Sequence, residues 1–235
     1  MRRDFPADKQ CGRVADTTSE RQIYKLLLQK MEPSTLPRIQ IRANYDEETI
    51  VVYQAYKPAI GEAALAAGHF VEPFSLNRMT WIKPSFLWMM ERCGWGEKKD
   101  QEVVLGIRIT RAGWEEALSN SVLSHPREGE YRDHNKWLEA KKKATAIVQW
   151  DPERDIFGNK LSWRSIQVGI SKDIISSYAK DWIREITKFT VRPLIKDIRA
   201  LIKAGKLTEA HELLPKEREY PVSEALAKRL AISRE

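Results

Sequence analysis

The chain has 235 residues, of which 42% are hydrophobic and 31% charged, and its formal net charge is +7. It holds no apolar run long enough to cross a membrane, no apolar segment typical of a secretory signal and only two cysteines, so we expect a globular cytoplasmic protein with no membrane association and no disulfide framework. The excess of positive charge favours a polyanionic partner, most simply a nucleic acid.

Hydrophobic periodicity divides the chain into alternating strand and helix patterns. Residues 1–18 are polar and aperiodic, which is typical of a flexible segment. In chain order, the following patterns predict a helix over 19–31, strands over 36–42 and 49–56, a helix over 58–68, a strand over 79–82 and a helix that Pro84 opens and Gly94 ends. The second half predicts a strand over 102–110, a helix over 111–122, at most one helix in 124–143, strands over 144–151 and 162–171, and helices over 173–189, 191–205 and 207–215.

This order of elements predicts an α+β fold. We expect one domain over residues 19–221, built on a mixed, mostly antiparallel sheet with packed helices and a helical C-terminal segment. Residues 222–235 form a helical tail in this interpretation. No internal repeat and no low-complexity segment interrupts the domain.

Several motifs that mark common enzyme classes are absent. The sequence has no G-x-x-x-x-G-K-[ST] loop, no G-x-G-x-x-G after a strand, no G-x-S-x-G elbow and no K-x-D-G adenylylation signature. The four histidines are scattered and no cysteine pair accompanies them, so a zinc site has little support. We therefore expect a protein that uses neither a nucleotide cofactor nor a metal.

A first group of polar side chains lies in residues 41–56. Arg42 ends one predicted strand and Tyr45 follows it, and Arg42 could present its planar fork to a phosphate. Gln54 and Tyr56 are two apart on the next strand and share a face. Such a face is either solvated or lines a cleft, and the cleft predicts substrate contacts from Tyr45, Gln54 and Tyr56.

A second group lies in the stretch RMTWIKPSFLWMMERCGW, residues 78–95. Trp81 and Lys83 share one strand face, and Lys83 stands just before a helix N-terminus, whose free N–H groups favour an anion. Ser85 adds a hydroxyl in the first turn. Lys83, Ser85 and the helix N-terminus together predict a phosphate pocket, and Trp81 is placed either to stack on a base or to cover the core.

A third group lies on the two strands near the middle of the chain. Arg164 alternates with apolar neighbours on one face, and Gln167 faces the other way. Because a buried arginine is costly without a partner, we expect Arg164 to meet an acidic residue, Asp151 or Glu153, or a bound anion.

Four segments, IRANYDEETIVVYQAY, RMTWIKPSFLWMMERCGW, VQWDPERD and RSIQVGIS, resemble the domain-of-unknown-function 4291 family of bacteria and fungi. The resemblance runs from about Pro37 to about Pro221. It implies an association with RNA end joining that needs no added nucleotide, in agreement with the absent nucleotide motifs.

Joining RNA without ATP requires an end that already stores the energy, such as a 2′,3′-cyclic phosphate attacked by a 5′-hydroxyl. Positive groups would stabilise the phosphorane-like transition state, and a base would accept the proton of the attacking hydroxyl. We expect Lys83, Arg42 and Arg164 to be the positive groups and His69 to be the candidate base.

Two alternatives stay open. In an ADP-ribosyltransferase that binds NAD without a Rossmann fold, Arg42 would hold the pyrophosphate and Tyr45 or Tyr56 would stack on nicotinamide, although no acidic residue is convincingly placed for the transfer. A non-catalytic RNA-binding module would use the same basic and aromatic surface without a proton acceptor.

Overall fold

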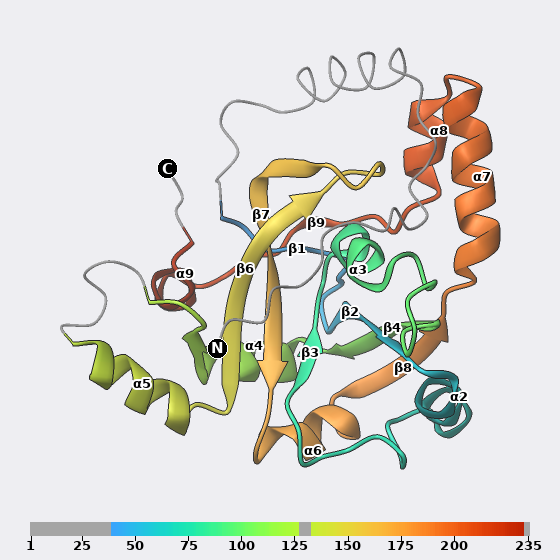
Figure 1. Ribbon diagram of the computed structural model, residues 1–235. Coiled ribbons are helices and arrows are strands. Elements are labelled where there is room, and N and C mark those ends of the chain that lie inside the picture. The colour runs from blue at the N-terminus through green and yellow to red at the C-terminus, as the bar shows by residue number, and fades with distance from the viewer. Residues whose placement is uncertain (1–38, 127–132, 233–235) are drawn as a thin grey trace, which may run out of the picture.

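The structure is a computed structural model that describes residues 39–126 and 133–232 (Figure 1). Its strands are β1 (Arg42–Ala43), β2 (Thr49–Tyr56), β3 (Thr80–Ile82), β4 (Val103–Thr110), β5 (Ser121–Leu123), β6 (Ala146–Arg154), β7 (Lys160–Ile170), β8 (Ile183–Lys188) and β9 (Arg218–Glu219). Its helices are α2 (Pro58–Ala67), α3 (Phe86–Cys93), α4 (Arg111–Ser119), α5 (His134–Lys143), α6 (Ile174–Ala179), α7 (Val191–Lys203), α8 (Leu207–Glu212) and α9 (Glu224–Leu230).

The strands form two main sheets and a short ribbon. One sheet has the order β2-β4-β8, the other has the order β3-β7-β6-β5, and β1 pairs with β9. The pair β5–β6 is parallel and the other pairs in the described residues are antiparallel. The predicted α+β class with a mixed, mostly antiparallel arrangement is therefore confirmed.

The two main sheets meet where β2 passes the end of β3. The Tyr53 N–H donates to the Lys83 carbonyl over 2.7 Å, which links the middle of β2 to the residue that follows β3. Helix α3 packs beside this junction, with Phe86, Met89 and Met90 buried against Tyr53. The apolar side of the helix therefore belongs to the core.

Helix α4 lies in the centre of the largest apolar cluster. Trp114 is fully buried there, and α4 contacts strands of both sheets as well as α6 and α9. Gly113 allows α4 to approach Trp182, because a Cβ at this position would lie 2.4 Å from the Trp182 ring. Leu230 and Ala231, at the end of α9, also belong to this cluster, so the helix after residue 222 packs on the domain.

The principal errors of the sequence prediction are in two helices. The predicted helix over 111–122 ends at Ser119, and Ser121–Leu123 becomes β5 beside β6. The predicted helix over 173–189 is α6 followed by β8, whose backbone completes the open edge of β4. In both places the chain forms backbone hydrogen bonds with a neighbouring strand. The stabilisation from this pairing outweighs the helical preference of the local sequence.

Other boundaries shift less. The predicted strand over 36–42 starts outside the described residues; from residue 39 onward the chain forms an isolated bridge at Ile39, the two residues of β1 and a further bridge at Tyr45. Helix α3 begins at Phe86 with Ser85 as its N-cap, so Pro84 precedes the helix. The predicted helix over 19–31 and the segment 1–18 lie outside the described residues.

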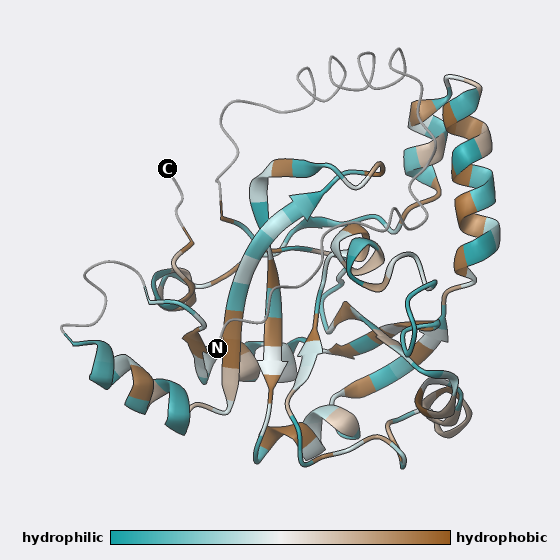
Figure 2. Cartoon of the chain, viewed as in Figure 1, coloured by the Kyte–Doolittle hydropathy of each residue, from teal (hydrophilic) through white to brown (hydrophobic). Residues whose placement is uncertain are grey.

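Hydropathy follows this packing (Figure 2). Brown and teal bands alternate along α7, whose buried residues Val191, Ile195, Ile198 and Ile202 recur at helical spacing. Within residues 39–126 and 133–232, the structure contains no helix with both the length and the apolar character needed to span a bilayer.

Candidate functional site

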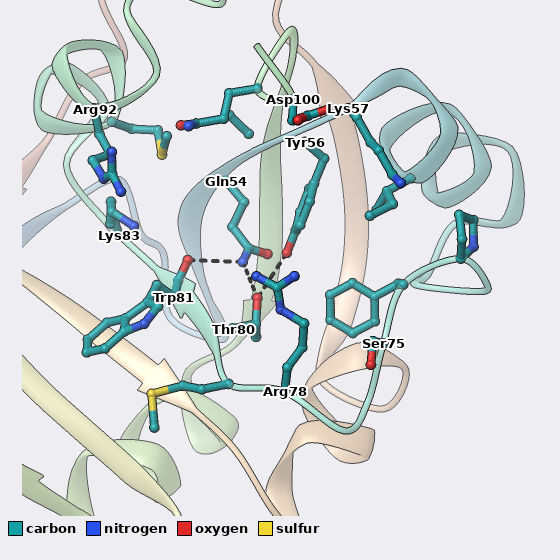
Figure 3. Close-up of a pocket in the computed structure, with 17 residues that line it drawn as sticks. Gln54, Tyr56, Lys57, Ser75, Arg78, Thr80, Trp81, Lys83, Arg92 and Asp100 are labelled. Atoms are coloured by element: carbon teal, nitrogen blue, oxygen red, sulfur yellow. Dashed lines mark hydrogen bonds between the residues drawn. The ribbon is translucent and has the colours of Figure 1, made fainter. Parts of the chain in front are cut away.

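A cavity of about 530 Å³ opens between α2, α3 and the strands β2 and β3. Five charged side chains of the described residues line it, and four of these are cationic: Lys57, Arg78, Lys83 and Arg92, against the single carboxylate of Asp100. Figure 3 shows Lys83 and Arg92 on one side and Lys57 on the other, with Arg78 reaching in beside Thr80. The charge of this lining favours an anionic ligand.

Lys83 is the unusual member of the set because only 5% of it is exposed. Burial lowers the pKa of its amine from 10.5 to about 7; the charge of nearby Arg92 adds to this effect, and Asp151 opposes it. The amine makes no hydrogen bond to any residue in the described part of the chain and lies 5.0 Å from the ring centre of Trp88. Near neutral pH a large fraction of Lys83 is therefore the uncharged amine, which can accept a proton.

The cavity wall beside Lys83 is set by the sheet. Trp81 pairs with Gly169 of β7 in the antiparallel register. A Cβ on Gly169 would lie 2.5 Å from the sulfur of Met79 and 3.0 Å from the Trp81 ring. Because Gly169 has no side chain, the half-buried Trp81 can pack over β7. Trp81 also lines the cavity.

The base of the cavity is a closed hydrogen-bond network. The Gln54 amide donates to Thr80 Oγ1 over 2.7 Å and to the Trp81 carbonyl over 3.0 Å (Figure 3). The Gln54 side-chain oxygen accepts from the Tyr178 hydroxyl. The Tyr56 hydroxyl is 2.9 Å from Thr80 Oγ1. Gln54 and Tyr56 line the cavity as predicted, but the polar atoms of Gln54 hold β2 and β3 together, which fixes the strand that carries Lys83.

The cavity lies within the part of the chain that a protein-family model matches. A family model described as Domain of unknown function (DUF4291) matches residues 40–220. The chain belongs to the DUF4291 family. The match contains all the residues that line the cavity, from Gln54 to Gln101. No curated protein matches the chain.

Two N–H groups at the N-terminus of α3 in this DUF4291 protein, those of Phe86 and Trp88, are bonded to side chains of the protein and are not available to a ligand, contrary to the prediction. The Ser85 hydroxyl accepts from the Trp88 N–H and donates to Glu153, and the Phe86 N–H donates to Glu217 over 2.7 Å. Burial raises the pKa of both carboxyl groups, and each of them lies near Arg42. The group that binds at this helix end is therefore a carboxyl side chain of the protein, and Ser85 lies outside the cavity lining.

The predicted base, His69, also lies away from the cavity. It is half-buried after the glycine that ends α2, and its Nδ1 is 2.9 Å from the Ala67 carbonyl. Arg42 donates to the carbonyl of residue 217, and the Tyr45 hydroxyl donates to the carbonyl of residue 219. Arg42 and Tyr45 thus hold the ribbon of β1 and β9, and neither they nor His69 line the cavity.

The third predicted group, Arg164 and Gln167, does not line the cavity either. Arg164 donates to the Trp150 carbonyl over 3.0 Å, rather than to Asp151 or Glu153, and it lines a different cavity of about 310 Å³. Gln167 donates to Asp151 over 2.6 Å. Of the ten predicted site residues, those that line the cavity of DUF4291 are Lys83, Gln54, Tyr56 and Trp81.

The sequence interpretation missed Lys57, Arg78, Arg92 and Asp100. Arg78 and Arg92 lie in the same stretch as Lys83, residues 78–95, and Lys57 directly follows Tyr56. Their closeness in sequence to the predicted site residues could have suggested them as candidates. The sequence does not show, however, which of its many cations face the same cavity. Within residues 39–126 and 133–232, no group of His, Cys, Asp or Glu side chains is arranged to hold a metal ion.

Proposed function

We propose that this protein is an RNA-acting enzyme that transfers a phosphoryl group at RNA ends, joining them without a nucleoside triphosphate, and that the cavity beside Lys83 receives the reacting phosphate. The observation that carries the proposal is a buried amine of pKa about 7 in a cavity whose other charged side chains are mostly cationic. A phosphate needs surrounding positive charge, and its reaction with a hydroxyl needs a proton acceptor.

The roles differ from those expected from the sequence. Lys83 becomes the proton acceptor in place of His69, because its amine is largely uncharged near neutral pH and lines the cavity. Arg78 and Arg92 replace Arg42 and Arg164 as the groups that balance the charge of the phosphate. Both arginines are exposed at the cavity wall, so they can reach a ligand that enters from solvent.

The chemistry balances without a cofactor. The 5′-hydroxyl oxygen of one RNA end forms a bond to the phosphorus of a 2′,3′-cyclic phosphate on the other end, and the bond from phosphorus to the 2′-oxygen breaks. Lys83 takes the proton of the attacking hydroxyl, and the resulting ammonium returns a proton to the departing 2′-oxygen. The positive side chains stabilise the additional negative charge of the transition state.

The test is a joining assay on RNA that carries a 2′,3′-cyclic phosphate and a 5′-hydroxyl, without ATP. We expect Lys83→Ala to reduce the rate by about 10² to 10⁴-fold, the range typical of a lost general base. Lys83→Arg should recover little, because a guanidinium stays protonated and cannot accept the proton. The wild-type rate should fall as the pH drops below about 7, where Lys83 becomes charged.

Lys228→Ala, an exposed change on α9 outside the cavity, is the matched control and should join at the wild-type rate. Melting curves of both alanine variants separate lost chemistry from lost folding. A folded Lys83→Ala protein with full activity contradicts the proposal. Salt-dependent RNA binding without any joining would instead indicate the binding module, and a thermal shift with NAD would indicate the ADP-ribosyltransferase.

A further inference from the structure

Helix α7 carries a row of cations on its exposed side. Arg192, Lys196, Arg199 and Lys203 are all exposed, whereas the buried residues of the helix follow a different row. At about 100° per residue, the four cations fall within an arc of about 60°, and at about 1.5 Å per residue they extend over roughly 16 Å. We name this row the α7 basic stripe.

The stripe contains no acidic residue. Asp197, the acidic residue of α7, lies about 130° around the helix from the centre of the stripe. Arg192, Lys196 and Lys203 form no ion pair with any residue in the described ranges. A solvated helix commonly places opposite charges four residues apart, and that pattern is missing here.

The like charges destabilise the helix. Arg192 and Lys196 are four residues apart, and a like-charge pair at this spacing costs about 0.2 to 0.5 kcal/mol. No acidic side chain of α7 lies on the same face to offset this repulsion. A surface that opposes its own stability in this way is typical of a binding surface for the opposite charge.

The stripe begins close to the segment that supplies part of the cavity rim. Helix α7 starts with the buried Val191, which lies beside Gly96. Gly96 belongs to the connection between α3 and β4, and the same connection contributes Asp100 and Gln101 to the cavity. This connection carries the exposed Lys98 and Lys99 together with the exposed Glu97, Asp100 and Glu102. The stripe therefore starts near the cavity, and the charge between the two is mixed.

We propose that the α7 basic stripe binds the phosphate backbone of a single-stranded RNA whose end occupies the Lys83 cavity. This inference rests on the RNA substrate of the proposed function. It adds a surface that binds the RNA strand at nucleotides distant from its reacting end. Backbone binding of this kind is independent of base sequence and depends strongly on salt, since cations that neutralise phosphates release counterions.

The test compares two triple variants with the same change in charge. The stripe variant is Arg192→Gln, Lys196→Gln and Lys203→Gln, and glutamine has a helix propensity close to that of lysine and arginine. The control variant on the exposed face of α5 is Lys136→Gln, Lys142→Gln and Lys143→Gln. The affinity of both variants for a long single-stranded RNA is measured across a salt series. The same series is repeated with an RNA of about five nucleotides that carries the same end and is too short to contact both the cavity and α7.

We expect the stripe variant to bind the long RNA more weakly, with a slope of log affinity against log salt reduced by about 2, or roughly 0.7 for each lost contact. Its affinity for the short RNA and its rate of joining short ends should match those of the wild type. The α5 control should retain the wild-type slope. Equal slopes for the stripe variant, the α5 control and the wild type would overturn the inference.

The outcomes separate this inference from the proposed reaction. If short ends are not joined by the wild type but the stripe variant still loses its salt slope with long RNA, the reaction is wrong and the RNA surface stands. If short ends are joined and the slope is unchanged, the surface is wrong. Loss of binding to anionic phospholipid vesicles, with RNA binding intact, would assign the stripe to a membrane surface and also overturn the inference.

Discussion

Replacing Lys83 with methionine removes the amine and keeps an unbranched side chain of similar length. The position is 5% exposed and packs near Trp88, so the apolar replacement suits its surroundings. We expect Lys83→Met to abolish joining and, at the same time, to raise the free energy of unfolding. Both effects have the same cause, because the buried amine that the reaction needs also destabilises the folded protein.

The magnitude follows from the pKa. Burial and the charge of Arg92 lower the pKa of Lys83 from 10.5 to about 7, so the unfolded chain binds the proton more tightly than the folded protein does. At about 1.4 kcal/mol per pH unit, this difference costs the folded protein on the order of 5 kcal/mol below pH 7. The cost declines as the pH rises from about 7 and disappears near 10.5, where the unfolded chain also loses the proton.

Urea denaturation of Lys83→Met and wild type at about pH 6, 8 and 10 measures this directly. The variant should be more stable by several kcal/mol at the lowest pH, and the advantage should shrink toward zero at the highest. Lys57→Met, an exposed change in the same cavity, should alter stability by less than about 0.5 kcal/mol. A stability difference for Lys83→Met that does not vary with pH, or a loss of stability at low pH, would refute the reasoning.

Three further predictions concern the scaffold. Phe86→Asp, at a position 1% exposed, should lower the free energy of unfolding by more than about 3 kcal/mol in urea denaturation, and an unchanged midpoint would mean that α3 faces solvent. Gly113→Ala should cost about 1 to 3 kcal/mol, because its Cβ would collide with Trp182 and the core must shift; a wild-type melting temperature would contradict this contact. Burial and the nearby Glu153 raise the pKa of Glu217, so the wild type loses stability as the pH rises above about 4.5. In urea denaturation, Glu217→Gln should therefore gain stability relative to the wild type as the pH rises above about 4.5, and parallel pH profiles would exclude a raised pKa for this carboxyl group.

Elements with a clear local pattern could be predicted from the sequence. The alternation in residues 49–56 and the long apolar run before Thr110 give β2 and β4. Pro58 and Gly68 bound α2, since proline suits the first turn and glycine readily adopts the left-handed conformation found at the C-cap. The segment that becomes β8 could not be assigned in this way, because its strand conformation depends on hydrogen bonds to β4, which is far away in the sequence.

The candidate site, like the fold, could be predicted from the sequence only in part. From the sequence alone, Lys83 could be placed between a strand and a helix, with Trp81 on the same face, in a basic chain. The burial of Lys83, the pKa of about 7 of its amine, and the presence of Lys57, Arg78 and Arg92 in the same cavity in place of His69, Arg42 and Arg164 follow from the tertiary structure. The physical reason is that burial and electrostatic interactions depend on distances in space, and packing of α2 and α3 against the strands sets these distances.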